Sequence, residues 1–387
     1  MNTHTRKCQR FAYLPLSTAL AVFATLATSV QAQAQQLLTF DAPGAGTGAY
    51  QGTSPAGINF AGTMTGSVTD SGNGTHGFVG AIKGGFTSFD APGADPVVGC
   101  TCPAAINDFG VVTGEEFDSN GAGHAFVRLP DGAFTVFDAP GADTAPGSYA
   151  GTTPQSINDF GVVTGYFWDA NSTAHGFIRT PDGNITTFDD PAAGDGSYQG
   201  TYPYSINNFG VIVGATTRSD NSSQGLLRAP NGTYADFQFP SATYYNTAYI
   251  NDLGVIAGSY SRIYLDSNVF DFAGYQRTPD GKWTTYEAPG AEIGTSYSYD
   301  GTWTNALNIE GTVTGYVSDV NDENHVFVRN ANGKIVVFDV PGQALIPGSG
   351  IGSGGEAINA QGMVAGRWHD PNYAAHGFLW LPETINY

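Results

Sequence analysis

Cysteine, methionine and basic residues are scarce in this chain, and recognised catalytic motifs are missing. Of three cysteines in 387 residues, only Cys100 and Cys102 lie beyond the first 34 positions. This excludes a disulfide scaffold, so stability must come from a large core. No Gly-x-Ser-x-Gly, His-Glu-x-x-His or phosphate-binding loop is present. The sequence therefore points to no particular catalytic chemistry or organic cofactor.

Positive charge is equally scarce. Three of the 14 basic residues and none of the 34 acidic residues lie in the first 34 positions, so the remainder carries 11 basic and 34 acidic residues, a formal charge of −23. Such an acidic chain repels phosphate backbones, which need clustered Lys and Arg, and we expect no nucleic-acid partner. Cations, neutral glycans and basic protein surfaces stay open as partners, and the charge also keeps a protein soluble.

The first 34 residues have the pattern of a secretory signal peptide. Arg6, Lys7 and Arg10 precede an apolar stretch at 16–30, and Ala32-Gln33-Ala34 follows. We expect cleavage near Ala32 or Ala34, which would leave residues 35–387 as a secreted or periplasmic bacterial protein. No later run is long and apolar enough to cross a bilayer, so membrane insertion is not expected.

One phrase returns seven times beyond this leader. In the clearest copy, Ser156-Ile157-Asn158-Asp159-Phe160-Gly161 is followed by His175-Gly176-Phe177 and Thr187-Phe188-Asp189. The Ile-Asn step, or Leu-Asn once, recurs at Ile58, Ile106, Ile157, Ile206, Ile250, Leu307 and Ile358. A period of about fifty residues is typical of repeat architectures.

Each copy contains four short strand-like runs separated by turn signals. Seven such copies predict an all-β fold, a seven-bladed β-propeller of four-stranded antiparallel blades that forms a single domain over 35–387. The chain enters on a fourth-type run at 38–41 and leaves after a third-type run at 376–379. The N-terminal strand is therefore expected to complete the last blade and close the ring. A parallel β-helix is the main alternative, and it would gain nothing from complementary ends.

An Asp-Gly or Asn-Gly pair separates the third and fourth runs. The pairs are Asp131-Gly132, Asp182-Gly183, Asn231-Gly232, Asp280-Gly281 and Asn332-Gly333. Such pairs are typical of two-residue type I′ turns. A two-residue turn would place Phe126 opposite Phe137 and Phe177 opposite Phe188, so we predict an apolar cross-strand pair of this kind in each of these copies.

His124-Ala125-Phe126 and the recurring Ile-Asn-x-x-Gly-x-Val-x-Gly resemble the bacterial extracellular HAF repeats, which are named for their His-Ala-Phe triplet. The resemblance covers nearly the whole chain beyond the leader. It implies the repeat architecture and carries no common activity with it.

Five copies begin the hairpin between their second and third runs with Asp and end it with His six residues later. The pairs are Asp70 and His76, Asp118 and His124, Asp169 and His175, Asp319 and His325, and Asp370 and His376. Metal ligation or acid–base work would explain such a pair, but five equivalents around a ring cannot converge on one substrate. We therefore interpret them as structural, with each carboxylate accepting a hydrogen bond from the imidazole.

The fourth and fifth copies depart from this rule. Arg218 and Arg262 take the Asp position, and Gln224 and Ala273 replace His. The loops nearby are rich in aromatic residues, namely Tyr198, Tyr202, Tyr204, Tyr244, Tyr245, Tyr249, Tyr297, Tyr299 and Trp303. Rings that stack on sugars and arginines that bind carboxylates suit an acidic carbohydrate. The alternative is that both copies have drifted and the rings only cover a blade edge.

Two smaller features remain. The densest acidic loop offers Asp319, Asn321, Asp322 and Glu323 as weak calcium ligands, although it lacks the spacing of an EF-hand and also fits a solvated hairpin tip. Cys100 and Cys102 stand two residues apart, which in an extended strand is at the limit for a disulfide.

The leading functional hypothesis from the sequence is a secreted binding module that presents the loop face of copies four to six to a glycan or a cell-surface protein. A structural or matrix-interaction protein comes second. A polysaccharide lyase or hydrolase comes third, without a catalytic residue to nominate. Apart from the weak calcium candidate, no cofactor is expected.

Overall fold

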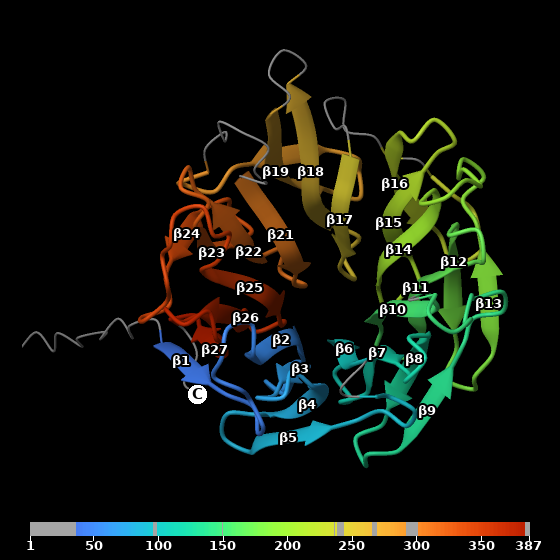
Figure 1. The fold of residues 1–387 in the computed structure, drawn as a ribbon. Helices are drawn as coiled ribbons and strands as arrows, with labels where there is room; N and C mark the ends of the chain where they lie inside the picture. Colours follow the sequence, from blue (N-terminus) through green and yellow to red (C-terminus); the bar gives the residue numbers. More distant parts are fainter. Residues whose placement is uncertain are drawn as a thin grey trace, which may run out of the picture. The chain divides into compact units, whose positions relative to one another are not determined.

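The computed structural model describes residues 36–95, 99–148, 150–235, 237, 244–264, 269–291 and 301–383. The chain divides into two parts, Met1–Ala34 and Gln35–Tyr387, and every described residue belongs to the second. In this described portion all regular elements are β-strands, and no helix is long and apolar enough to span a membrane. Figure 1 shows small sheets arranged around a centre.

The described strands follow the seven sequence copies, called repeats 1 to 7 here, and neighbours within a repeat are antiparallel. The first strands, nearest the centre in Figure 1, are β2 (Gly52–Ile58), β6 (Thr101–Ile106), β10 (Thr152–Ile157), β14 (Gly200–Ile206), β17 (Tyr244–Ile250), β21 (Gly301–Leu307) and β25 (Ser353–Ile358). The second strands are β3 (Met64–Thr69), β7 (Val112–Phe117), β11 (Val163–Trp168), β15 (Ile212–Thr217), β18 (Ile256–Tyr264), β22 (Val313–Ser318) and β26 (Val364–His369).

The third strands are β4 (Thr75–Ala81), β8 (Gly123–Arg128), β12 (Ala174–Arg179), β16 (Ser223–Arg228), β19 (Val269–Arg277), β23 (Asn324–Arg329) and β27 (Ala375–Leu381). The outer strands are β5 (Gly85–Phe89), β9 (Phe134–Phe137), β13 (Ile185–Phe188), β20 (Trp283–Tyr286), β24 (Ile335–Phe338) and, beside β27, β1 (Gln36–Phe40). In repeat 4 this outer place holds two isolated bridges, from Arg228 to Tyr234 and from Gly225 to Phe237.

The asparagine that follows each first strand links its repeat to the next. Asn158 Oδ1 accepts the backbone N–H groups of Phe160 and Val162 at 3.1 and 3.0 Å, and its Nδ2 donates to the carbonyl of Asn207 at 3.1 Å. The same donation, at 3.0–3.3 Å, runs from Asn59 to Asn107, Asn107 to Asn158, Asn207 to Asn251, Asn251 to Asn308, Asn308 to Asn359, and Asn359 back to Asn59. One buried side chain therefore shapes its own turn and joins two repeats.

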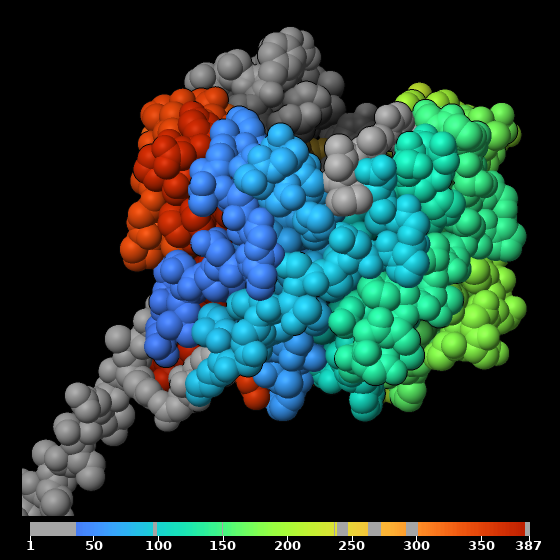
Figure 2. Space-filling view, turned by 60° about the horizontal axis from the view of Figure 1, so that its bottom comes forward, coloured from blue at the N-terminus to red at the C-terminus, as the bar shows by residue number. Residues whose placement is uncertain are grey.

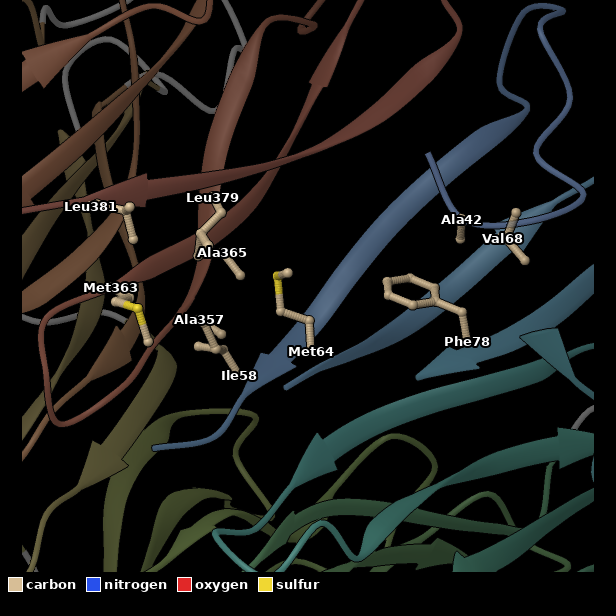
Figure 3. Close-up of a cluster of buried hydrophobic side chains, with 10 residues drawn as sticks. All are labelled: Ala42, Ile58, Met64, Val68, Phe78, Ala357, Met363, Ala365, Leu379 and Leu381. Carbon is tan, nitrogen blue, oxygen red and sulfur yellow. The ribbon is translucent and has the colours of Figure 1, made fainter. Parts of the chain in front are cut away.

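The two ends of the Gln35–Tyr387 part meet in one sheet. β1 pairs antiparallel with β27, and Figure 2 shows the N-terminal residues in blue lying against C-terminal residues in red. An apolar cluster fills the space between repeats 7 and 1 (Figure 3). Its buried members are Ala42, Ile58, Met64, Val68, Phe78, Ala357, Met363, Ala365, Leu379 and Leu381. Residues some 300 positions apart in sequence thus share one core cluster.

The turn between the third and fourth strands differs from the predicted one. In repeat 3 the Thr180 N–H donates to the Asn184 carbonyl, and the Gly183 N–H donates to the Thr180 carbonyl, both at 2.9 Å, so the loop contains three residues, 181–183. Gly183 has a φ of +89°, whereas Asp182 does not have a positive φ. A type I′ turn needs positive φ at both central residues, and the prediction of that turn is therefore wrong here.

The longer loop shifts the strand register by one residue. Phe188 lies opposite Gly176 and not opposite Phe177, and Phe137 likewise lies opposite Ala125, so the predicted aromatic pairs are wrong. A Cβ at Gly176 would lie 2.6 Å from the Phe188 ring. The glycine of the His-Gly-Phe triplet leaves room for this ring, while Phe177 points into the core and is fully buried.

Neighbouring repeats approach closely where a first strand begins. Gly200 pairs in parallel with Ala174, and with a φ of +124° a Cβ there would lie 2.0 Å from the Ala174 carbonyl oxygen. The next residue, Thr201, is fully buried, and its hydroxyl accepts a backbone N–H at 2.9 Å. In repeat 2 the glycine is replaced by Cys100, whose Cα lies 5.8 Å from that of Cys102, and a disulfide joins the two.

Candidate functional site

Every first strand contains one β-bulge. In six repeats the extra residue stands two positions before the Ile or Leu of the Ile-Asn step, and these residues are Ala56, Ala104, Gln155, Tyr204, Asn305 and Glu356. A bulge redirects its side chain out of the regular alternation of a strand. All six residues line one central cavity of about 440 Å³. The shared backbone therefore builds the cavity, and the variable side chains decide its chemistry.

The central cavity lies on the side of the loops that enter the first strands. The lining residues that belong to first strands precede the asparagines along each strand, and the asparagines bound a separate cavity of about 210 Å³. The entering loops touch the hairpins between second and third strands, since Gln199 Nε2 donates to Asn221 Oδ1 at 2.9 Å. These two sets of loops therefore surround the mouth of the central cavity.

Polar groups gather on one side of the central cavity. Repeats 1 and 2 contribute the small residues Ala56, Ala104 and Ser67, whereas repeats 6 and 7 contribute Asn305, Glu356 and Arg367. Arg367 occupies the position in its second strand that Ser67 holds in repeat 1. Because repeats 7 and 1 are neighbours, the small residues leave space next to the polar ones, and a ligand in that space can reach Asn305, Glu356 and Arg367.

Glu356 is the central group of this polar wall. Its Oε2 accepts a hydrogen bond from Asn305 Nδ2 at 3.1 Å, and its Oε1 lies 3.3 Å from Arg367 Nε. The Glu356 side chain is 23% exposed and that of Arg367 is 49% exposed, because both face the open cavity. Desolvation raises the pKa of Glu356, and the Arg367 charge and the Asn305 hydrogen bond partly oppose this rise. The wall thus presents an acceptor and a donor side by side.

Two tyrosines line the same cavity. Burial raises the pKa values of Tyr204 and Tyr249, so both phenols stay protonated at neutral pH. Neither hydroxyl has a hydrogen-bond partner among the described residues. A hydroxyl both donates and accepts hydrogen bonds, so these two groups are available to a polar ligand.

Four aromatic rings gather near the cavity on repeats 3 and 4. The Tyr202 ring lies 5.4 Å from that of Tyr166 and 5.8 Å from that of Trp168, and the Tyr198 ring lies 5.8 Å from that of Trp168. Tyr198 is 72% exposed, and the Tyr202 hydroxyl donates to the Tyr198 carbonyl at 2.9 Å. Burial raises the pKa of Tyr202 to about 12, and the nearby phenols of Tyr166 and Tyr202 further raise the pKa of Tyr204. The rings form an aromatic platform beside the cavity wall.

Repeat 2 places two adjacent carboxyl groups on opposite faces of β7. Glu115 accepts a hydrogen bond from Thr153 Oγ1 at 3.1 Å, and burial raises its pKa to about 7. Glu116 is 1% exposed, burial raises its pKa to about 7, and its Oε2 has no hydrogen-bond partner within the described part of the chain. Both carboxyl groups therefore favour the protonated form in the folded protein more than they would in water.

Glu116 should make the protein less stable as the pH rises. The pKa of Glu116 is about 7 in the folded state, above the reference value of 4.5. Between these two pH values the folded state therefore binds more protons than the unfolded state, and the free energy of unfolding falls as the pH increases. We expect Glu116→Val, which copies Val68 and Val317, to stabilise the protein by about 1–2 kcal/mol more near pH 8.5 than near pH 4. Urea unfolding at both pH values measures this difference, and equal effects would contradict it.

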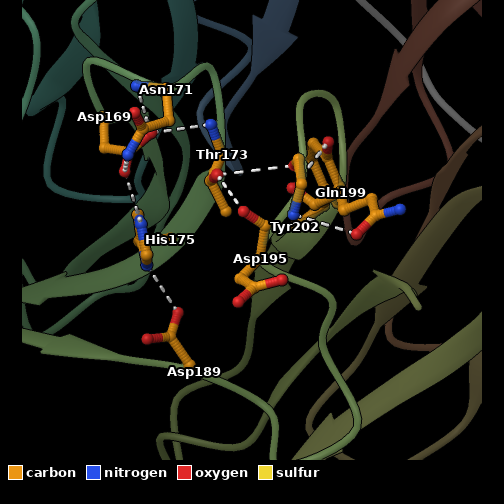
Figure 4. Close-up of polar contacts among 9 residues, drawn as sticks. Asp169, Asn171, Thr173, His175, Asp189, Asp195, Gln199 and Tyr202 are labelled. Carbon is orange, nitrogen blue, oxygen red and sulfur yellow. Dashed lines mark hydrogen bonds and ion pairs between the residues drawn. The ribbon is translucent and has the colours of Figure 1, made fainter. Parts of the chain in front are cut away.

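The Asp/His hairpins are held by a different set of contacts than predicted. Oδ1 of Asp169 accepts the N–H groups of Asn171 and Thr173 at 2.9 and 2.8 Å (Figure 4). His175 Nε2 is 3.8 Å from Asp169 Oδ2, too long for a hydrogen bond, while its Nδ1 is 2.9 Å from Oδ1 of Asp189. The imidazole is therefore hydrogen-bonded to the aspartate that follows the fourth strand.

The other four repeats of this type share that contact. At 2.6–2.9 Å, Nδ1 of the histidine meets the carboxylate in the pairs His76 and Asp90, His124 and Asp138, His325 and Asp339, and His376 and Asp41. The Asp six residues before the His closes its own hairpin, as Asp70 and Asp118 do by accepting two backbone N–H groups each. In repeat 1 the predicted contact is present as well, because His76 Nε2 lies 3.5 Å from Asp70 Oδ2. The Thr-x-Phe-Asp phrase held the second aspartate at a constant spacing, which could have revealed this partner.

The remaining sugar-site candidates separate in the structure. Arg218 donates to Gln224, so the two unusual residues of repeat 4 pair with each other. Trp303 stacks between Phe272 and Tyr316, with ring centroids 4.1 and 5.9 Å away. Tyr297, Tyr299 and the side chains of Tyr244, Tyr245 and Arg262 lie outside the described part. Of the predicted set, Tyr204 and Tyr249 reach the cavity, and Tyr198 and Tyr202 reach the aromatic platform.

Sequence reasoning missed Gln155, Asn305, Glu356 and Arg367. The available signal was their departure from the repeat: Glu356 and Asn305 stand where repeats 1 and 2 have alanine. These positions lie inside strands, and nothing in the local sequence shows that a bulge turns their side chains toward a common centre.

The acidic loop of repeat 6 is placed differently from a calcium loop. Ligand atoms of Asp319 and Glu323 lie within 4.8 Å of each other and of a His325 ring nitrogen. Asn321 Nδ2 donates to Asp319 Oδ2 at 3.2 Å, and Asp322 occupies a turn position with a φ of +59°. The cluster thus contains an imidazole and two of the four predicted residues.

Comparison with known proteins gives the fold alone. No family model matches the chain, and no curated protein sequence matches it. The BP39L lectin from Burkholderia pseudomallei superposes with a TM-score of 0.51 at 10% identity, covering 92% of this chain and 97% of the lectin. A puromycin hydrolase S511A mutant complexed with PGG gives 0.50 at 13% identity, covering 82% of this chain and 50% of that one. The β-propeller domain of the Trilobed protease from Pyrococcus furiosus gives 0.49 at 9% identity, covering 86% and 93%. The chain is thus an all-β protein with a propeller-like arrangement of sheets.

Proposed function

We propose that the seven repeats form a closed seven-bladed β-propeller of an exported protein of the HAF-repeat type. The asparagine hydrogen bonds that return from Asn359 to Asn59 support a closed ring. The pairing of β1 with β27 supports completion of the last blade by the N-terminal strand. The basic start, the apolar stretch and the small residues near Ala34 support export.

We propose further that this propeller binds carbohydrate in its central cavity. The observation that carries the proposal is Glu356, hydrogen-bonded to Asn305 and beside Arg367 on a cavity wall that also holds Tyr204 and Tyr249. Neighbouring sugar hydroxyls each donate and accept, and a carboxylate next to a guanidinium meets both requirements. A volume of about 440 Å³ falls within the range of about 300–1,000 Å³ common for small-ligand sites.

The aromatic platform supports the same assignment. Tyr198 is largely exposed, and its ring, together with those of Tyr202 and Trp168, offers apolar surface on which a sugar ring can stack at the cavity mouth. The likeness of the fold to a lectin is in keeping with such a role. A chain of sugars would then place one unit in the cavity and the next on the platform.

A glycan array that includes neutral and uronate-containing glycans, followed by calorimetry with the best binder, tests the proposal. The informative variants are Glu356→Ala and Arg367→Ser, because Ala56 and Ser67 hold these positions in repeat 1 and the fold should tolerate them. Hydrogen bonds to charged groups contribute about 1.5–3 kcal/mol, so each variant should weaken binding by about tenfold or more. Phe160→Ala changes an exposed residue close to Asn158, one of the seven asparagines that are hydrogen-bonded from repeat to repeat and are called the asparagine circle here. This variant should leave affinity unchanged.

Two results would count against carbohydrate binding in the cavity. One is a folded protein that binds no glycan on the array. The other is a glycan whose affinity is the same for the wild type, Glu356→Ala and Arg367→Ser, since the ligand must then bind elsewhere. Arg218→Ala separates this proposal from the sequence-based one: because Arg218 pairs with Gln224, its removal should not change affinity.

A further inference from the structure

Repeat 6 carries a third ligand-type side chain in its Asp/His hairpin. Glu323 follows Asp319 by four residues, a position held by Gly74, Ala122, Thr173 and Ala374 in the other repeats with this hairpin. Glu323 is only 9% exposed as a residue, and its carboxylate has no hydrogen-bond partner among the described residues. A carboxylate in a largely buried residue is stabilised by a partner of positive charge, and a cation beside Glu323 would supply one.

The three groups converge on one point. Ligand atoms of Asp319, Glu323 and His325 all lie within 4.8 Å of one another, and His325 Nε2 is 3.9 Å from Asp319 Oδ2. Tetrahedral zinc with bonds of about 2.0–2.1 Å separates its ligand atoms by roughly 3.3 Å. Movements of about 1 Å at a hairpin end would bring the three atoms to that spacing. Asp319 and His325 are only 19% and 18% exposed, so their positions are already restricted.

Neighbouring groups already orient the side chains of His325 and Asp319. His325 Nδ1 lies 2.6 Å from Asp339 Oδ1, so the proton on Nδ1 is donated to this carboxylate and the Nε2 lone pair faces Asp319 and Glu323. A carboxylate that holds the far nitrogen of a metal-binding histidine is a recurrent feature of zinc sites. Asp319 Oδ1 is held by the N–H groups of Asn321 and Glu323, both at 2.9 Å, which leaves Oδ2 on the side of the imidazole.

We propose that Asp319, Glu323 and His325 bind one divalent transition-series cation, of which Zn²⁺ is the representative. One imidazole and two carboxylates suit zinc, with water completing a fourth position, whereas calcium takes six to eight oxygen ligands and does not favour imidazole. The two carboxylates neutralise the ion. The site is separate from the central cavity residues and does not depend on the carbohydrate proposal.

Zinc titration of the purified protein, freed of metal by a chelator, tests this site. Calorimetry and the metal content after dialysis should give one Zn²⁺ per chain, and bound zinc should raise the Tm. Glu323→Ala and His325→Gln should each weaken zinc binding by at least tenfold. Both should fold, since Ala122 and Ala374 replace the glutamate and Gln224 replaces the histidine in other repeats. Cobalt, titrated in place of zinc, gives an optical readout of the same ligands.

Repeat 3 provides the matched control. It has the same Asp169, His175 and Asp189 arrangement but Thr173 in place of the glutamate, so His175→Gln should leave zinc stoichiometry and affinity unchanged. Absence of zinc binding by the folded wild type overturns the proposal. So does zinc that binds equally well to Glu323→Ala and His325→Gln, or a loop that binds Ca²⁺ in preference to Zn²⁺.

Discussion

Removal of residues 1–41 should abolish the folded state, whereas a chain that starts at residue 35 should be as stable as the full one. The longer deletion removes β1, whose five residues pair with β27, and the side chains of Leu38 and Phe40, which pack on the apolar cluster between repeats 7 and 1. Lost backbone hydrogen bonds cost about 1 kcal/mol each, and the two partly buried side chains cost about 1 kcal/mol each. The total exceeds about 5 kcal/mol, comparable with the whole stability of many domains.

Urea unfolding followed by circular dichroism measures the effect, and gel filtration shows whether the bared edge of β27 causes association. Phe40 also lies over Gly377, where a Cβ would come within 2.4 Å of its ring, so Phe40→Ala should give part of the same loss. An unfolding midpoint that is unchanged by the longer deletion would show that β1 does not complete the sheet in solution.

Asn158→Ala should lower the free energy of unfolding by about 3 kcal/mol. The substitution leaves the N–H groups of Phe160 and Val162 and the carbonyl of Asn207 without their partner, and each buried polar group left unsatisfied costs about 1 kcal/mol or more. Because Asn158 is 6% exposed, water cannot easily take over these bonds.

Two further variants separate the parts of this effect. Asn158→Asp keeps the acceptor for the two N–H groups but loses the donor to Asn207, so it isolates the contact between repeats. Phe160→Ala, at a residue that is 68% exposed, should change stability by no more than about 0.5 kcal/mol. A loss for Asn158→Ala no larger than that of Phe160→Ala would mean that the asparagine circle adds nothing to the fold.

The candidate site was only partly predictable. The sequence predicts Tyr204 and Tyr249 as loop aromatics on the ligand face, and the structure places both on the cavity wall inside strands β14 and β17. The sequence predicts that Arg218 binds a carboxylate of the ligand, whereas in the structure Arg218 pairs with Gln224. The cavity tyrosines and Arg218 all depart from the repeat consensus, so this departure alone does not separate ligand-binding residues from others. Whether the departing side chain faces a ligand or a neighbouring residue depends on contacts that a single sequence does not display.

The register of the outer strands also could not be predicted from local sequence alone. An Asp-Gly pair correctly marked a tight turn, but the φ of Asp182 decided between a two-residue and a three-residue loop. That choice moved Phe188 from Phe177 to Gly176. Turn residues restrict backbone angles without selecting a single value, so the packing of the ring over glycine determined the register.

The sequence by itself determined the features that depend on residues a few positions apart. The period of about fifty residues, the strand-like runs in each copy, the turn glycines and the strand-like N-terminal segment at 38–41 all follow from local pattern and chain order. Only the tertiary structure decided which groups meet across repeats. Asn158 reaches the next repeat, residues of repeats 7 and 1 share a core, and the bulges bring Glu356, Asn305 and Tyr204 to one cavity. The reason is geometric: local rules act along one strand, whereas the distance between side chains of different repeats is set by the packing of whole sheets around the centre.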